Sequence, residues 1–211
     1  MRFSISGLKA AYLIAILGGP VAPALATSTP ETPPPAAMRL AQQVLTSADH
    51  GGLPFAVVDK TAAMLAVFRG DGQLLGSTPV LLGRTPGDRA APGVGARTQN
   101  GQLQVADQVT TAGRFGSQPG RNLAGEDVVW IDYESALAIH RLRPGASQRE
   151  RSLRLASTNP QARRVSAGCV VVPVAFYEAV VAPVLGRGRG VVYVMAEDSG
   201  PPPLPLAAPG S

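Results

Sequence analysis

A single cysteine and two histidines are the residues of this 211-residue chain with the clearest capacity for chemistry. Cys169 lies in the segment Val165-Ser-Ala-Gly-Cys-Val-Val-Val-Pro173, where Gly168 lets the backbone approach a substrate closely and a following helix could present amide donors to the sulfur. A thiolate would be stabilised in such a place. The alternative is that Cys169 is a small buried hydrophobic residue among valines, which is the commoner fate of a free cysteine.

A nucleophilic cysteine needs a base that takes its proton, and histidine is the usual one. His50 precedes the predicted core, so His140 is the candidate. Residues 137–142 alternate as a strand would, which puts His140 on one face together with Ala138 and Leu142. His140 could equally be an ordinary half-buried strand residue.

Other kinds of catalytic site lack their residues in this chain. One cysteine and two histidines are too few for a usual zinc site, and no HExxH or paired CxxC motif is present. Gly83-Arg-Thr-Pro-Gly87 lacks the spacing of a phosphate-binding loop, and no GxSxG motif supplies a serine nucleophile. We therefore expect no metal and no cofactor, and cysteine with histidine remains.

The elements that must position these residues are mostly strands. A short amphipathic helix is predicted at Met38–Ala48, and β-prone runs at Phe55–Asp59, Met64–Phe68 and Gln73–Leu82 predict a three-stranded antiparallel meander. Residues 83–125 are rich in Gly, Pro, Arg and Thr, which is typical of binding loops. Further strands are predicted at Gln102–Val105, Val128–Tyr133, Leu137–Leu142 and Val191–Met195, and a helix at Pro173–Leu185.

Short strands without alternating helices argue against a parallel βαβ sheet. The sequence therefore predicts a mostly β domain, an antiparallel β-sandwich or distorted barrel, with one or two packed helices. We place this domain at residues 52–197. Residues 27–51 are interpreted as a Pro/Thr-rich linker with the short helix, and residues 198–211 as a disordered Pro-rich tail.

Residues 1–26 have the pattern of a secretory signal peptide. Arg2 and Lys9 precede an apolar stretch, Ala10–Leu17, and Ala24-Leu25-Ala26 fits a signal peptidase site. A retained membrane anchor is the alternative, but the apolar stretch is shorter than the roughly twenty residues that span a bilayer. We expect export to the periplasm or cell envelope, with no integral membrane span after cleavage.

Charge and cysteine content exclude two further classes. The net charge of +5 is spread over scattered arginines and only 5% of residues are aromatic, so nucleic acid is not an expected partner. An exported chain with one cysteine cannot form an internal disulfide, and it therefore carries a lone thiol.

The segment Ser166-Ala-Gly-Cys-Val170 resembles the Ser/Thr-His-Gly-Cys-hydrophobic signature of the L,D-transpeptidase (YkuD-type) catalytic domain. The resemblance covers most of the mature chain. Val57–Lys60 with Leu65–Phe68 is similar to the opening strands of that domain, Thr110–Phe115 is similar to its Thr-Pro-x-Gly-x-Phe loop, and Ala138-Ile-His140 takes the place of its upstream histidine motif.

The resemblance implies an enzyme, an acyltransferase acting on peptidoglycan stem peptides. Cys169 would attack the stem-peptide carbonyl, His140 would be the base, and the main-chain carbonyl of Arg141 would orient its ring. Amides around Gly168 and Cys169 would form the oxyanion hole, with Ser166 a supporting polar group at the mouth. The acyl group would pass to a second stem amine, to a protein amine or to water, and no cofactor is required.

Three departures from the family pattern leave an alternative open. Ala167 replaces the usual histidine, and Val171 replaces Asn or Arg. His140 and Cys169 are 29 positions apart (169 minus 140), which is roughly ten more than is usual in the family. An insertion of this length in a loop costs little free energy. A catalytically inactive peptidoglycan-binding or scaffold domain would fit these changes. The extra segment, residues 143–164, could be a lid. Its arginines either bind substrate carboxylates or stay solvated. They are Arg149, Arg151, Arg154, Arg163 and Arg164.

Overall fold

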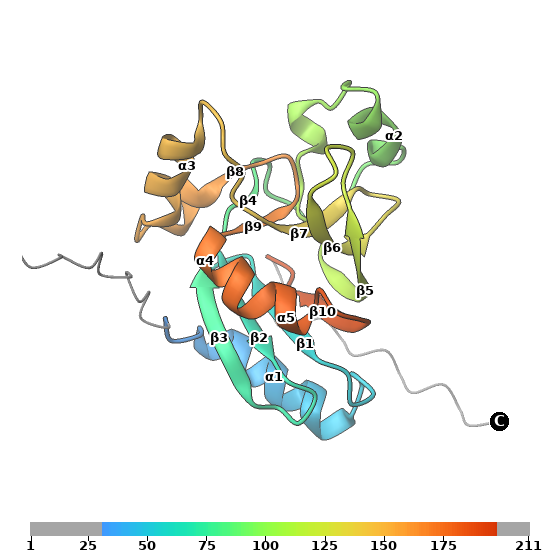
Figure 1. Cartoon of the computed structure of the whole chain (residues 1–211), viewed down its shortest axis with the longest axis vertical. Helices are drawn as coiled ribbons and strands as arrows, with labels where there is room; N and C mark the ends of the chain where they lie inside the picture. Colours follow the sequence, from blue (N-terminus) through green and yellow to red (C-terminus); the bar gives the residue numbers. More distant parts are fainter. Residues whose placement is uncertain (1–30, 198–211) are drawn as a thin grey trace, which may run out of the picture.

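The computed structural model describes residues 31–197 (Figure 1), so the expected signal peptide and the Pro-rich tail lie outside the described residues. The fold is mostly β, as predicted. One eight-stranded sheet has the order β3-β2-β1-β10-β5-β6-β7-β9, and β4 pairs with β8 in a small second sheet. The strands are β1 (Phe55–Asp59), β2 (Met64–Phe68), β3 (Leu74–Pro79), β4 (Leu82–Gly83), β5 (Gly113–Arg121), β6 (Asp127–Asp132), β7 (Leu137–Arg141), β8 (Arg164–Ser166), β9 (Val170–Val172) and β10 (Gly190–Val194).

The helices are short and lie outside the sheet. They are α1 (Pro35–Ser47), α2 (Val94–Gln99), α3 (Gln148–Leu155), α4 (Val174–Phe176) and α5 (Ala182–Val184), with a π-helical turn at Tyr177–Val181 between the last two. Single 3₁₀ turns occur at Val105–Asp107 and Pro160–Arg163. None of the helices between residues 31 and 197 is long and apolar enough to cross a bilayer.

The large sheet curls until its two edges nearly meet. Leu81 follows the edge strand β3, and Val171 lies in the opposite edge strand β9. The main-chain N–H of each donates to the carbonyl of the other at 2.9 Å. The sheet is therefore a nearly closed, distorted barrel, in which few strand edges remain unpaired.

Helices cover both faces of the strands β1, β2 and β10, and for this reason β1 and β2 are buried throughout. On one face, Tyr177 and Val181 of the α4–α5 segment pack into a core with Val58 and Leu65. On the other face, α1 packs against side chains that alternate with these along the strands, including Phe55, Phe68 and Tyr193. In Figure 1 the α4–α5 segment crosses in front of these strands.

The helix predicted at Met38–Ala48 spans Pro35–Ser47 and is packed more closely than a linker would be. Ala37, Leu40, Ala41 and Val44 are all buried against the sheet. The packed unit therefore includes α1 and extends further towards the N-terminus than residue 52.

Within residues 83–125 one predicted strand is wrong and one observed strand was not predicted. Gln102–Val105 does not form a strand, because Val105 begins a 3₁₀ turn that is capped by Gln104. The strand β5 was not predicted, since Gly113, Gly116, Pro119 and Gly120 are all poor strand formers. Pro119 is tolerated because β5 is paired on one side only at this point: β6 pairs with residues 118–121, whereas β10 pairs only with residues 113–117.

The three-stranded meander is confirmed, but the sheet is not wholly antiparallel. β1 pairs with β10 and β7 pairs with β9, both in parallel. A parallel pair needs a crossover connection of a dozen or more residues. The connection between β7 and β9 contains α3 and β8, so the long spacing between His140 and Cys169 is the length of a crossover.

Leu40 tests whether α1 stabilises the domain. Leu40 is fully buried, so Leu40→Ala should lower the free energy of unfolding by about 2–5 kcal/mol. Met38 is 41% exposed on the same helix, and Met38→Ala should change it by less than about 0.5 kcal/mol. Urea unfolding followed by circular dichroism measures both variants. A Leu40→Ala protein as stable as the Met38→Ala protein would show that α1 is dispensable.

Candidate active site

The parallel pairing of β7 with β9 places His140 and Cys169 on the same face of the sheet. His140 is the register partner of Val171. Cys169 lies two residues before Val171, immediately ahead of β9, so its side chain projects on the same face as that of His140. Leu142 and Val171 pack together on this face, whereas Ile139 and Val170 point into the main core. The alternation predicted for residues 137–142 is the alternation observed.

His140 is buried, with 7% of its surface exposed, and its ring is held by the main chain. Its Nδ1 lies 2.8 Å from the carbonyl oxygen of Arg141. A carbonyl can only accept, so Nδ1 carries the proton and Nε2 keeps a lone pair. Burial lowers the pKa of His140 to about 4, although the Arg141 carbonyl opposes the shift. The imidazole is therefore neutral at pH 7.

Cys169 is partly buried, and its thiol donates to the carbonyl oxygen of Ala136 at 3.4 Å. Burial raises the pKa of this thiol, and a main-chain hydrogen bond from Ala138 and the charges of Arg143 and Arg151 oppose the shift only in part. The expectation of a stabilised thiolate is therefore wrong for the resting site. In the resting site both the Cys169 thiol and the His140 imidazole are therefore neutral.

Gly168 gives the loop before Cys169 its shape. Its φ of +129° lies in the region that favours glycine, and a Cβ atom there would come within 3.0 Å of the carbonyl oxygen of Val109. The backbone of the loop at residues 109–110 therefore packs directly on the loop that carries Cys169. Any side chain at position 168 would push the two loops apart.

Ser166 is also a loop-forming residue. Its hydroxyl donates to the carbonyl oxygen of Cys169 at 2.7 Å and accepts from the N–H of Gly168 at 3.1 Å. Ser166 is 4% exposed, so the expectation that it lies at the mouth of the site is wrong. The N–H of Gly168 is occupied by this hydrogen bond. The main-chain N–H of Cys169 is therefore the donor of this loop that could bind an oxyanion.

Thr110 was not singled out as a site residue by sequence reasoning, although it begins the segment that resembles the family's Thr-Pro-x-Gly-x-Phe loop. Its hydroxyl donates to the carbonyl oxygen of Gly168 at 2.7 Å and accepts from the N–H of Gly83 at 2.8 Å. Thr110 is 1% exposed. Thr110 therefore fixes the loop that carries Cys169 against β4, and the motif was the signal that could have indicated it.

The buried ammonium group of Lys60 holds the main chain of Thr110 in place. The Nζ atom of Lys60, which is fully buried, donates to the carbonyl oxygens of Thr110 and Gly87 at 3.0 and 2.6 Å. It also pairs with the carboxylate of Asp88, and Glu197 approaches it at 3.4 Å. These contacts join the loop of residues 83–112 to the end of β1 and to the chain that follows β10.

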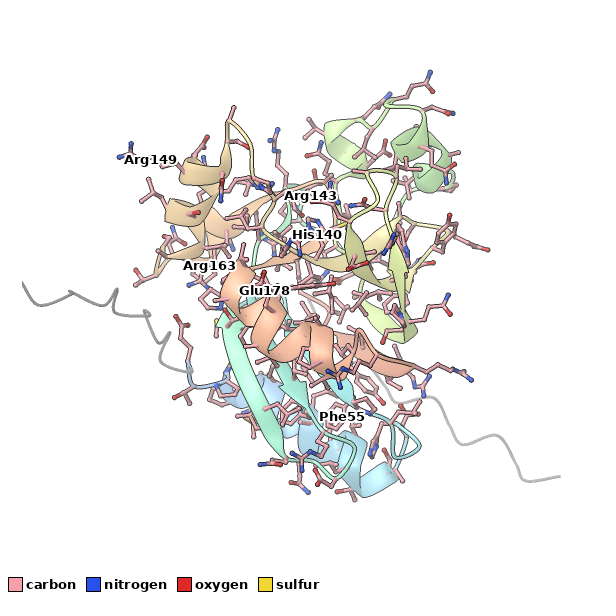
Figure 2. The ribbon with its side chains drawn as sticks, in the orientation of Figure 1. Phe55, His140, Arg143, Arg149, Arg163 and Glu178 are labelled. Carbon is pink, nitrogen blue, oxygen red and sulfur yellow. The ribbon has the colours of Figure 1, made fainter. Side chains whose placement is uncertain are left out.

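The arginines of the crossover have different surroundings, so one description does not fit them all. Arg149 is exposed and points outward (Figure 2), as expected of a solvated charge. Arg163 is buried and donates to the carbonyl oxygens of Ser157 and Ala63 at 3.0 and 3.1 Å, and Arg164 pairs with Glu197 at 2.9 Å. The solvated interpretation is therefore wrong for Arg163 and Arg164.

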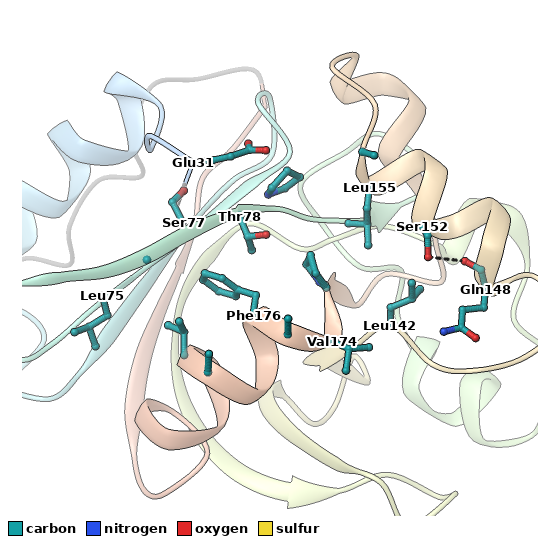
Figure 3. A pocket seen from close by; sticks show the side chains of 17 residues that line it. Glu31, Leu75, Ser77, Thr78, Leu142, Gln148, Ser152, Leu155, Val174 and Phe176 are labelled. Carbon is teal, nitrogen blue, oxygen red and sulfur yellow. Dashed lines mark hydrogen bonds between the residues drawn. The ribbon is translucent and has the colours of Figure 1, made fainter. Parts of the chain in front are cut away.

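A groove of about 520 Å³ lies between the edge strand β3, α3 and α4 (Figure 3). Phe176 and Val180 approach β3 closely at Gly76, where the strand has no side chain. The lining includes Leu142 and Leu155 but neither His140 nor Cys169. Within residues 31–197, no cluster of three or more His, Cys, Asp and Glu side chains is arranged to hold a metal ion.

No protein-family model matches the sequence, and no curated protein matches it. Loosely similar solved structures include the helical cell shape determining protein Pgp2 from Campylobacter jejuni, at 14% identity and a TM-score of 0.44, over 71% of this chain and 49% of that one. The chain thus spans about half the length of Pgp2.

L,D-transpeptidases are also among these structures. The enzyme from Mycobacterium smegmatis has 17% identity and a TM-score of 0.37, over 68% of this chain and 58% of that one. The catalytic domain from E. faecium has 16% identity and a TM-score of 0.36, over 67% of this chain and 95% of that one. At such values the likeness does not extend to function, which must be argued from the site itself.

Thr110→Val tests the contact between the two loops. It replaces the hydroxyl by a methyl group of similar size and leaves the buried Gly168 carbonyl and Gly83 amide without that partner, so the free energy of unfolding should fall by about 1–3 kcal/mol. Thr110→Ser keeps the hydroxyl, so its free energy of unfolding should stay closer to that of the wild type. Urea denaturation of the three proteins measures this. Equal losses in the two variants would mean that packing, and not the hydrogen bonds, holds the loop.

The pKa of His140 makes stability depend on pH. A pKa of 6.5 in the unfolded chain and about 4 in the folded protein means that the unfolded state binds more protons between these values. Stability is therefore complete above pH 6.5 and should fall by about 3 kcal/mol as the pH drops towards 4. His140→Gln should flatten this part of the curve in denaturant titrations at each pH. An unchanged slope would contradict a buried, neutral His140.

Proposed function

We propose that the chain is an L,D-transpeptidase-like cysteine acyltransferase that acts on peptidoglycan stem peptides through a Cys169 thioester, with His140 as base. The observation that carries the proposal is the parallel pairing of β7 with β9, which sets both side chains on one face with the His140 ring held by Arg141. The substrate class rests on the resemblance of residues 166–170 to the family signature. The proposed location is the periplasm or cell envelope.

The neutral resting pair determines the form of the mechanism. The thiol leaves the Ala136 carbonyl and turns to the free Nε2 of His140, which takes the proton as the sulfur attacks the substrate carbonyl carbon. The Arg141 carbonyl then faces a positively charged ring and stabilises it through Nδ1–H. The main-chain amide of Cys169 stabilises the oxyanion.

The tetrahedral intermediate collapses by expelling the amine of the donor peptide, which takes the proton back from Nε2. A thioester on Cys169 remains. A second amine or water attacks this thioester, His140 accepts the proton of the attacking group, and the thiol is regenerated. Atoms and charges balance without a cofactor, and the identity of the second nucleophile decides between cross-linking, protein attachment and hydrolysis.

A scaffold domain without turnover is the second candidate. It is favoured by the hydrogen bond from the thiol to Ala136 and by the raised pKa of Cys169, both of which keep the sulfur protonated. Ala167 and Val171, which depart from the family signature, point the same way. This candidate requires a thiol with slow, ordinary reactivity.

Intact-mass spectrometry after incubation with a carbapenem, which acylates active cysteines of this family, separates the two. The wild type should form a stable adduct that Cys169→Ala lacks. His140→Ala should form it more slowly by roughly 10²–10⁴-fold, the usual contribution of a general base. His140→Gln serves as the control that preserves bulk at the buried position.

The result that would favour the scaffold is a folded wild-type protein whose Cys169 reacts with a small alkylating reagent but never with the carbapenem. If the adduct forms, a stem tetrapeptide with and without an added amine identifies the acceptor. Free peptide acid alone would indicate a hydrolase.

A further inference from the structure

Glu197 follows the end of β10 and contacts three other segments of the chain. Its carboxylate accepts from Nη2 of Arg164 at 2.9 Å and lies 3.4 Å from Nζ of Lys60. The main-chain N–H of Gly87 donates to the same carboxylate oxygen at 3.4 Å. The main-chain N–H of Glu197 in turn donates to the carboxylate of Asp88 at 3.1 Å. The chain that leaves β10 is therefore held against β8, the end of β1 and the loop that follows β4.

Two buried cations meet at this carboxylate. The side chain of Lys60 is fully buried, and that of Arg164 is only 7% exposed. The Nη1 atom of Arg164 is also buried and has no hydrogen-bond partner within residues 31–197. Removal of one partner of a buried ion pair is strongly destabilising, because an uncompensated charge remains. Loss of the Glu197 charge should therefore shift both cations and the groups that they hold.

Lys60 connects Glu197 to one side of the loop that carries Cys169. Its Nζ atom donates to the carbonyl oxygen of Thr110 at 3.0 Å. The hydroxyl of Thr110 donates to the carbonyl oxygen of Gly168 at 2.7 Å, and Gly168 immediately precedes the cysteine. A continuous series of contacts therefore leads from Glu197 to the residue before the sulfur.

Arg164 connects Glu197 to the other side of this loop. Arg164 is the first residue of β8, and Ser166 is the last. The hydroxyl of Ser166 donates to the carbonyl oxygen of Cys169 at 2.7 Å. The two residues whose hydroxyls hold the loop, Thr110 and Ser166, are therefore both connected to Glu197.

We propose that Glu197 is a positioning residue for Cys169. It acts through the two buried cations on the two hydroxyl hydrogen bonds that hold the loop around the cysteine, and not on the reacting atoms. This inference rests on the proposed function for the reaction that Cys169 performs. Reacting groups must be held within about 0.5 Å of their productive geometry, so a small shift of this loop is enough to slow acyl transfer.

The test compares the rate at which a carbapenem acylates Cys169 with the rate at which iodoacetamide alkylates it, both followed by intact mass. Acylation needs a sulfur that is fixed against a bound carbonyl, whereas alkylation, in which the sulfur displaces iodide, needs only an accessible thiol. Glu197→Gln keeps the size of the side chain and removes its charge. It should lower the acylation-to-alkylation rate ratio by roughly ten- to hundredfold, the cost of a small misplacement of a reacting group.

Glu178→Gln is the matched control, because Glu178 is exposed on the α4–α5 segment (Figure 2). Exposed charges are screened, so this variant should keep the rate ratio within about twofold of the wild type. Glu197→Asp retains the carboxylate and should recover part of the loss. An unchanged ratio in folded Glu197→Gln protein would overturn the proposal, and so would equal losses in Glu197→Gln and Glu178→Gln.

NMR tests the positioning role if the wild type forms no carbapenem adduct, a result that would refute the proposed function alone. The main-chain N–H resonances of Gly168 and Cys169 are compared between the wild type, Glu197→Gln and Glu178→Gln. Chemical shifts report the geometry of the folded protein and not its stability. Both resonances should move in Glu197→Gln and stay in place in Glu178→Gln. Resonances that stay in place in both variants would overturn the positioning role.

A second variant keeps both measurements decisive if Glu197→Gln does not fold. Arg164→Gln combined with Glu197→Gln removes both charges of this ion pair, and replacement of both partners costs less than replacement of one. The double variant also lacks the Glu197 carboxylate, so the same fall in the rate ratio and the same movement of the two resonances are expected. A double variant that matches the wild type in both measurements would overturn the proposal.

Discussion

The buried ammonium of Lys60 is the interaction on which the candidate site depends. A charge removed from water costs several kcal/mol unless it is paired and hydrogen-bonded, and Lys60 meets that demand with the Asp88 carboxylate and two main-chain carbonyls. One of these carbonyls belongs to Thr110, whose hydroxyl holds the carbonyl of Gly168. The position of Cys169 is thus set by a chain of contacts that begins at Lys60, immediately after β1.

Periodic patterns predicted the parts of the fold in which side-chain burial alternates. The meander β1–β2–β3, the faces of β7 and the helix after Pro173 all follow from the spacing of apolar residues, because one face or stripe of each must leave water. The same reasoning identified His140 and Cys169, since each was the only residue of its kind in a suitable segment. The structure places His140 beside Val171 and Cys169 immediately before β9.

Residues whose roles depend on distant main-chain atoms could not be predicted in this way. Ser166 and Thr110 act on the carbonyls of Cys169 and Gly168, and the types of these residues do not indicate such partners. β5 is a strand because β10 and β6 supply its hydrogen bonds and despite its glycines. The burial that raises the pKa of Cys169 likewise comes from tertiary packing and not from the residues next to it.

Strand β9 lies between β7 and Leu81, so a single short strand both completes the barrel and delivers the sulfur. Both neighbours are remote in sequence, so chain entropy must be lost before β9 can pair with either of them. A molecule in which β9 has not docked has an open sheet edge and also lacks the Cys169–His140 pair. Closure of the sheet and the placement of Cys169 and His140 on one face thus depend on the same strand, and a chain in which β9 has not docked has neither.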